Sequence, residues 1–248
     1  HLFNKIFKKN KLKLYPLDSE HYSLNSFFQS KFKNSYNSIT LTATGGPFLF
    51  KNYKNITFKQ AIKHPKWKMG YKNSIDSATL ANKCLEVVEA HYLFNIPYNK
   101  IDIIIHSEAF VHSIIELKDW SIIMNSFFPD MFIPIFNFLS EATNQKKFPL
   151  IEKFKFGKKR SINFVDINHT KYPIFKIFQK IDKKHPTEII KFNCSNEIAV
   201  EKFKSGKLKF NQIHEFIDNS LSLDFNHSVN TLDQVIDFQK NFKSMLSK

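Results

Sequence analysis

Arginine is almost absent from this sequence of 248 residues, although the chain is strongly basic. Lysine and arginine total 37 against 22 acidic residues, and the single arginine is Arg160, so the formal net charge of +15 comes from lysine. Proteins that read nucleic-acid sequence use arginine for bidentate contacts to bases and carry a recognisable module. The sequence contains no zinc-finger spacing, RNP-like strand or basic heptad, so we expect no nucleic-acid partner.

Cysteine and long hydrophobic runs are also scarce. Cys84 and Cys194 form no CxxC pair, which excludes a disulfide framework and a thiolate metal site. No stretch reaches the ~18 consecutive apolar residues of a membrane helix, so we expect no membrane partner. The remaining composition, 42% hydrophobic and 24% charged residues, is typical of a globular protein of one or two domains.

Strand patterns dominate the first half of the chain. Strands are predicted at residues 11–17, 37–43, 101–106, 111–117 and 121–127. The first strand would deliver the acidic run Asp18–His21 to its carboxyl end, where sites gather in α/β sheets. Apolar residues at helical spacing behind a polar start predict one long helix over 75–94, whereas residues 129–139 show no regular pattern.

The second half of the chain is helical in pattern. Amphipathic stretches are predicted at residues 172–181, 195–206, 212–221 and 231–246. They indicate a small C-terminal bundle. The predicted fold class is therefore α/β (α+β): a mixed sheet flanked by helices, followed by a helical bundle.

Two carboxylates stand close together in the run YPLDSEH. Asp18 and Glu20 are two residues apart, so in an extended backbone they project to the same side. Two close carboxylates repel each other unless a proton or a cation lies between them. An isolated pair of this kind is more often a solvated turn, and a hard divalent cation needs further oxygen ligands.

The predicted helix over 75–94 offers further polar groups. Asn82, Lys83 and Glu86 are spaced so that they share one helix face, and Ser77 lies near the predicted helix start, where free backbone N–H groups favour an anion. A phosphate held by Ser77, Asn82 and Lys83 beside a metal ion at Glu86 is one interpretation. The alternative is an ordinary capped helix with a Lys83–Glu86 ion pair.

Seven runs, in this order, resemble the 1-deoxy-D-xylulose 5-phosphate reductoisomerase family of the non-mevalonate isoprenoid pathway. They are LDSEH, TATGGPF, HPKWKMG, KNSIDSATLANKCLEVVEAHYLF, VHS, PDM and NEIAVEKF. The resemblance implies a metal-dependent isomerisation followed by NADPH-dependent reduction, which converts 1-deoxy-D-xylulose 5-phosphate into 2-C-methyl-D-erythritol 4-phosphate. It also implies a homodimer joined through the sheet of the catalytic domain.

The resemblance assigns roles to individual positions. Asp18, Glu20 and Glu86 match the acids that bind Mg²⁺ or Mn²⁺, and together with Lys83 they are the expected catalytic residues. The expected substrate-binding residues, most of them at the phosphate, are Ser19, Thr44, His64, Trp67, Ser77, Asn82, Lys83 and Glu86. Trp67 lies on an expected mobile flap at 60–72, and Gly70 and Met131 match positions near NADPH. His21 is expected to orient the neighbouring acids and His112 to be structural.

The resemblance also divides the chain. Residues 1–17 match the end of a Rossmann-type NADPH-binding domain, 18–139 the catalytic domain, 140–170 a linker and 171–248 the bundle. The 17 residues before Asp18 contain no GxGxxG-like turn, so most of the hydride-donor site is expected to be missing and the chain alone inactive. The alternative function is a non-catalytic remnant or phosphate-binding module. The expected location is the bacterial cytoplasm, with the plastid stroma as second choice.

Overall fold

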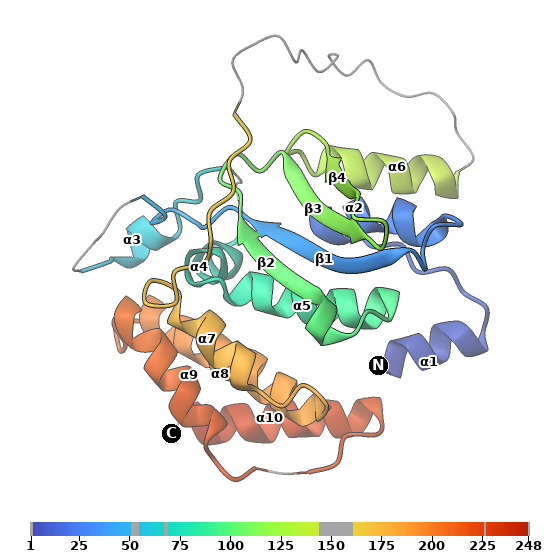
Figure 1. Ribbon diagram of the computed structural model, residues 1–248. Coiled ribbons are helices and arrows are strands. Elements are labelled where there is room, and N and C mark those ends of the chain that lie inside the picture. The colour runs from blue at the N-terminus through green and yellow to red at the C-terminus, as the bar shows by residue number, and fades with distance from the viewer. Residues whose placement is uncertain (1, 51–54, 67–68, 144–160, 226, 248) are drawn as a thin grey trace. The chain divides into compact units, whose positions relative to one another are not determined.

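A computed structural model describes residues 2–50, 55–66, 69–143, 161–225 and 227–247 (Figure 1). The chain divides into two compact units. The sheet unit contains residues 12–44 and 89–166, and the helical unit contains residues 1–11, 45–88 and 167–248.

A mixed sheet of four strands forms the core of the sheet unit. Its strands are β1 (Tyr36–Ala43), β2 (Ile101–Ile105), β3 (Val111–Leu117) and β4 (Ile122–Ser126), in the order β2-β1-β3-β4. The pair β1 and β2 is parallel, whereas β3 is antiparallel to both β1 and β4. Ile39 and Leu41 of β1 and Ile115 of β3 are fully buried, as expected for β-branched and aliphatic residues in central strands. The predicted mixed sheet is confirmed.

Helix α2 (Ser19–Gln29) packs against β3 and β4, and α6 (Phe132–Ala142) follows the last strand. α2 buries Leu24 and Phe27, and its Ser23 hydroxyl donates to the Ser113 hydroxyl of β3 at 2.6 Å. This buried contact fixes the position of α2 on the sheet. Residues 129–139 show no regular sequence pattern, yet α6 begins within them, because Pro134 lies in the first turn, where a missing N–H costs nothing.

The predicted strand at residues 11–17 was also wrong. Residues 12–17 belong to no strand, because the described sheet offers them no partner, and α2 begins at Ser19. Asp18 therefore lies at the start of a helix rather than at the end of a strand. The extended spacing assumed for Asp18 and Glu20 does not apply.

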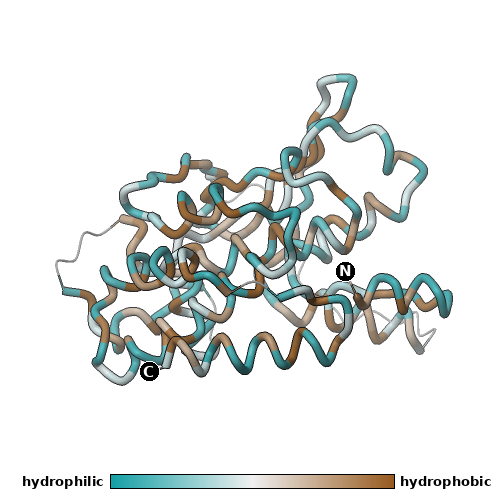
Figure 2. Tube along the Cα trace, turned by 90° about the horizontal axis from the view of Figure 1, so that it is seen from below, coloured by the Kyte–Doolittle hydropathy of each residue, from teal (hydrophilic) through white to brown (hydrophobic). Residues whose placement is uncertain are grey.

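The helical unit contains most of the helices. They are α1 (Leu2–Lys9), α3 (Phe58–Ala61), α4 (Tyr71–Thr79), most of α5 (Ala81–Phe94), α7 (Pro173–Lys180), α8 (Pro186–Lys204), α9 (Ile213–Leu221) and α10 (Leu232–Ser247). Short 3₁₀ helices cover Tyr98–Lys100 in the sheet unit and Phe210–Gln212 in the helical unit. The helices α7 to α10 confirm the predicted C-terminal bundle. Hydrophobic and hydrophilic residues alternate along α10, which buries Phe238, Phe242 and Leu246 (Figure 2).

The single helix predicted over 75–94 is broken at Leu80. Leu80 has a left-handed backbone with φ 63°, and its N–H donates to the carbonyl of Ser77. This conformation costs a non-glycine residue roughly 1–2 kcal/mol, and the side chain of Leu80 is buried. The break ends α4 at Thr79 and starts α5 at Ala81, so Ser77 lies at the end of a helix and not near its beginning.

Residues 144–160 of the predicted linker lie outside the described residues, and the predicted domain boundaries stay predictions. Val165 forms an isolated antiparallel bridge with Ile105 of β2. Among the described helices, none combines the length and the apolar character that crossing a membrane requires.

Candidate active site

The acidic run begins α2 in the sheet unit. Asp18 is the N-cap residue of α2, yet its carboxylate makes no capping hydrogen bond to the helix. Glu20 lies in the first turn, and the Ser19 hydroxyl donates to Glu20 Oε2 at 2.5 Å. A helix N-terminus stabilises negative charge, so the start of α2 can hold two carboxylates close together.

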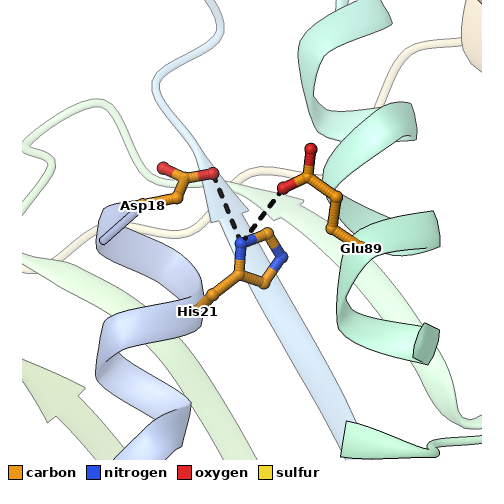
Figure 3. A group of neighbouring side chains, drawn as sticks. All are labelled: Asp18, His21 and Glu89. Atoms are coloured by element: carbon orange, nitrogen blue, oxygen red, sulfur yellow. Dashed lines mark ion pairs between the residues drawn. The ribbon is translucent and has the colours of Figure 1, made fainter. Parts of the chain in front are cut away.

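A buried histidine joins this run to α5 (Figure 3). His21 is 1% exposed, and its Nδ1 lies 3.4 Å from Asp18 Oδ2 and 3.4 Å from Glu89 Oε2. The expectation that His21 orients the neighbouring acids agrees with this geometry. The side chains of Asp18, His21 and Glu89 each offer one ligand atom, all within 4.8 Å of one another, so they could also hold a metal ion.

Sequence reasoning missed Glu89. It follows Glu86 by three residues in the run EVVEA, and residues three apart project from the same side of a helix. This spacing was the available signal. Since α5 is one continuous helix, Glu86 lies one turn before the carboxylate that approaches His21.

The first turns of α5 carry a buried polar cluster. Lys83 Nζ lies 2.5 Å from Glu86 Oε2, and Asn82 Nδ2 donates to Glu86 Oε1 at 2.5 Å. Lys83 is 5% exposed and Glu86 is 4% exposed. The shared polar face expected for these three residues is therefore present. The Lys83–Glu86 ion pair of the ordinary interpretation exists, but it is buried rather than solvated.

His64 and Ser77 form a second polar pair in the helical unit. His64 Nε2 lies 3.1 Å from Ser77 Oγ, and the N–H of Lys66 donates to His64 Nδ1. Burial lowers the pKa of His64 to about 4, so the imidazole is neutral near pH 7. Because Nδ1 accepts a hydrogen bond, the ring proton lies on Nε2, which donates to Ser77.

The other predicted positions are spread over both units. Thr44 directly follows β1 in the sheet unit, where Met131 is the N-cap residue of α6. Met69 and Gly70 directly precede α4 in the helical unit. Trp67 lies outside the described residues, so the flap expected at 60–72 stays a prediction.

The surroundings of His112, which was expected to be structural, and of Cys84 are explained by packing. His112 is buried, its ring stacks on Phe127 at 3.9 Å between centroids, and its Nε2 lies 3.3 Å from the carbonyl oxygen of Phe127. Cys84 is fully buried, and burial raises the pKa of its thiol far above the usual value. Neither side chain has the surroundings of a reactive group.

Two family models match the chain. The 1-deoxy-D-xylulose 5-phosphate reductoisomerase C-terminal domain matches residues 14–94, and the DXP reductoisomerase C-terminal domain matches residues 128–245. The chain belongs to the 1-deoxy-D-xylulose 5-phosphate reductoisomerase family. The family expected from the sequence is confirmed.

Curated proteins similar to this chain are named as reductoisomerases of this family. A 1-deoxy-D-xylulose 5-phosphate reductoisomerase of Sulfurihydrogenibium sp. (strain YO3AOP1) is 38% identical over 249 residues, which cover 98% of this chain and 66% of the relative. One from Clostridium perfringens (strain SM101 / Type A) is 35% identical over 243 residues, which cover 96% of this chain and 62% of the relative. The chain thus spans slightly less than two thirds of the length of these reductoisomerases.

Solved reductoisomerase structures share the fold. A DOX-P reductoisomerase in complex with NADPH, fosmidomycin and magnesium has a TM-score of 0.84 and 29% identity, over 98% of this chain and 64% of that chain. The Zymomonas mobilis reductoisomerase in complex with NADPH has a TM-score of 0.85 and 29% identity, over 99% and 64%. The predicted fold class is confirmed by these similarities.

Proposed function

We propose that this chain is the metal-binding and sugar-phosphate-binding part of an enzyme that converts 1-deoxy-D-xylulose 5-phosphate into 2-C-methyl-D-erythritol 4-phosphate with NADPH. Family membership and the names of the relatives support the reaction. The observation that carries the proposal is the polar face of α5. Asn82, Lys83 and Glu86 contact one another on this face. Glu89 follows Glu86 by one helical turn. A cation site and an anion site therefore lie next to each other on one helix.

The proposed metal ligands are Asp18, Glu20 and Glu86. Each offers one carboxylate oxygen, and oxygen is the ligand atom that Mg²⁺ and Mn²⁺ prefer. The carboxylate of Glu86 is buried, which favours a cation beside it. A bound divalent ion would supply Lewis-acid stabilisation of negative charge on the substrate oxygens.

The group of Asp18, His21 and Glu89 is the competing metal site. It contains an imidazole nitrogen, which suits softer transition metals better than Mg²⁺. In our proposal the imidazole of His21 instead lies between the carboxylates of Asp18 and Glu89 and fixes the orientation of Asp18. Similarity to a reductoisomerase that binds magnesium favours the all-oxygen set.

The proposed phosphate site uses Ser77, Asn82 and Lys83, with His64 as a neutral donor to Ser77. The Lys83 ammonium supplies charge, and the positive end of the α5 dipole lies at Ala81, next to Asn82. Phosphate binding far from the reacting carbons provides energy that orders the site and excludes water. Ser19 is proposed to bind sugar oxygens, Thr44 the phosphate, and Trp67 and Met69 to cover the substrate.

A hydride donor belongs to the same proposal. NADPH is bound by the reductoisomerases of two of the similar structures, and Gly70 and Met131 are the positions proposed to approach it here. The bacterial relatives support the bacterial cytoplasm as the proposed location.

The metal assignment is tested by titrating the 248-residue chain with Mn²⁺ and following free Mn²⁺ by electron paramagnetic resonance. Glu20→Gln and Glu86→Gln should each weaken Mn²⁺ binding by roughly tenfold or more, because each removes a charged ligand. Glu116→Gln is the control, since Glu116 is an exposed acid on β3 that accepts hydrogen bonds from Ser38 and Asn37. Glu116→Gln should leave Mn²⁺ affinity unchanged.

Glu89→Gln separates the two candidate metal groups. Our proposal expects only a small loss of Mn²⁺ affinity from Glu89→Gln, because Glu89 acts through His21. A tenfold loss of Mn²⁺ affinity in Glu89→Gln, together with normal Mn²⁺ affinity in Glu20→Gln, would indicate that Asp18, His21 and Glu89 bind the metal instead. Normal binding in Glu86→Gln would contradict the proposed site.

A further inference from the structure

A short glycine loop, residues 45–49, lies against the end of α4 in the helical unit. Gly45 and Gly46 have φ angles of 76° and 66°, which favour glycine. A Cβ atom on Gly46 would lie 2.6 Å from Ala78 Cα and 3.0 Å from the carbonyl oxygen of Ser77. The glycine loop therefore touches the helical turn that carries Ser77.

Two consecutive side chains from a distant part of the sequence, Lys171 and Tyr172, hold this loop. The Tyr172 hydroxyl donates to the carbonyl oxygen of Gly45 at 2.8 Å, and Lys171 Nζ donates to the carbonyl oxygen of Leu49 at 2.5 Å. Tyr172 is 1% exposed, so the hydrogen bond to Gly45 is shielded from water. Burial raises the pKa of Tyr172 to about 12, so the hydroxyl keeps its proton near pH 7.

The backbone is fixed both before and after Tyr172. Before it, Asn168 Oδ1 accepts hydrogen bonds from the N–H groups of Thr170 at 2.9 Å and Lys171 at 3.0 Å. After it, Pro173 starts α7, which buries Ile174, Ile177 and Phe178. The hydroxyl of Tyr172 therefore has a defined position from which to hold the loop.

We propose that Tyr172 is a positioning residue of the sugar-phosphate site. Its hydroxyl fixes the Gly45 carbonyl and so holds the glycine loop in contact with the turn of α4 that carries Ser77. Tyr172 acts through the loop and does not touch the substrate. The same hydrogen bond fixes the peptide group between Gly45 and Gly46, which lies one residue after Thr44. The inference rests on the proposed function, because Ser77 and Thr44 matter only if a phosphate binds there.

The test is Tyr172→Phe in the 248-residue chain, which removes the hydroxyl and keeps the ring. We expect roughly tenfold weaker calorimetric affinity for 1-deoxy-D-xylulose 5-phosphate, because the buried Gly45 carbonyl loses its donor and the loop relaxes. Mn²⁺ affinity should stay within about twofold of wild type, because Tyr172 lies outside the proposed ligand set. The backbone amides of Gly46, Phe48 and Leu49 should exchange hydrogen faster.

Tyr36→Phe is the matched control. Tyr36 lies at the start of β1, the end away from Thr44, and its ring packs on Phe28 and faces the Lys100 ammonium at 5.4 Å. The control should change neither affinity nor amide exchange in the glycine loop. If Tyr172→Phe does not fold, Lys171→Met removes only the second contact and should weaken sugar-phosphate affinity by a smaller factor, with Mn²⁺ affinity unchanged.

Unchanged sugar-phosphate affinity in Tyr172→Phe would overturn the inference and leave the proposed function intact. A parallel fall in Mn²⁺ and sugar-phosphate affinity would also overturn it, because that result indicates general loosening of the fold. A wild-type chain that binds no sugar phosphate at all would overturn both proposals.

Discussion

The buried pair of Lys83 and Glu86 is the residue-scale feature on which the site depends. Both residues are at most 5% exposed, and their charged atoms lie 2.5 Å apart. Removing one partner from a buried ion pair costs about 3–5 kcal/mol, because the other charge is left uncompensated. A metal ion beside Glu86 and a phosphate beside Lys83 would each add the opposite charge, so cation and anion should bind more tightly together than alone.

His64 predicts a pH dependence of stability. Its pKa in the folded chain is about 4 because of burial, against an ordinary value of 6.5. Between these pH values the unfolded chain binds more protons than the folded chain, so the stability that neutral His64 contributes is present above pH 6.5 and is lost as the pH falls towards 4. His64→Gln should reduce the loss of unfolding free energy between pH 7 and pH 4.5 by on the order of 1 kcal/mol, measured by urea titration.

The control for this measurement is His185→Gln. The His185 side chain is 71% exposed and pairs with Asp182 at the surface. This variant should keep the pH dependence of the wild-type chain. An equally steep loss of stability in His64→Gln would show that the protonation of His64 does not oppose folding.

At the scale of elements, the contact between the glycine loop and α4 gives a second prediction. Gly46→Ala places a Cβ atom against the α4 backbone and keeps a left-handed φ, so it should lower the unfolding free energy by about 3–5 kcal/mol. Gly206 also has a left-handed φ, of 75°, but a Cβ atom there would meet no atom within 4 Å. Gly206→Ala should cost only about 1–2 kcal/mol.

Urea titration of both variants separates the clash from the backbone strain. Equal losses of unfolding free energy in Gly46→Ala and Gly206→Ala would mean that the glycine loop does not pack closely against α4.

Elements with a clear period could be predicted from the sequence, and those governed by tertiary contacts could not. The β-branched run at 101–105 and the alternation at 37–43 predicted β2 and β1 because burial sets both patterns. Residues 11–17 alternate equally well, but within the part of the chain that the structure describes they pair with no strand. The break at Leu80 carries no glycine or proline signal, and burial of Leu80 holds it in a conformation that its own preference opposes.

In the site, too, contacts within one helix could be predicted from the sequence, whereas those between distant segments could not. The helical spacing of Asn82, Lys83 and Glu86 predicted their contacts, since spacing along one helix fixes geometry. The place of Ser77 at the end of α4 was not predictable, because it follows from the break at Leu80. Glu89 approaches His21 from another part of the chain, and no local pattern pairs these two residues.

At the scale of the whole molecule, β4 is one of the two edge strands of the described sheet, and exposed apolar side chains lie on β4 and on the turn before it. Trp120 is 82% exposed, Ile122 59% and Met124 47%. Exposed edges of this kind pair with other chains, which supports the proposed homodimer joined through the sheet. Ile122→Lys should shift the chain from dimer to monomer in analytical ultracentrifugation at micromolar concentration.

Met245→Lys is the control for the dimer prediction, since Met245 is a partly exposed apolar residue on α10. It should leave the dimer intact. A wild-type chain that sediments as a monomer at all concentrations would contradict the homodimer.

The most direct test of the account is the ³¹P relaxation of 1-deoxy-D-xylulose 5-phosphate bound to the 248-residue chain in the presence of Mn²⁺. If Asp18, Glu20 and Glu86 hold the ion and Lys83 holds the phosphate, the paramagnetic ion should accelerate ³¹P relaxation in the wild-type chain. At a Mn²⁺ concentration near the wild-type dissociation constant, the effect should fall steeply in Glu86→Gln, which binds the ion more weakly, and in Lys83→Met, which binds the phosphate more weakly. Relaxation as fast as in wild type in either folded variant would contradict a shared metal and phosphate site on α5.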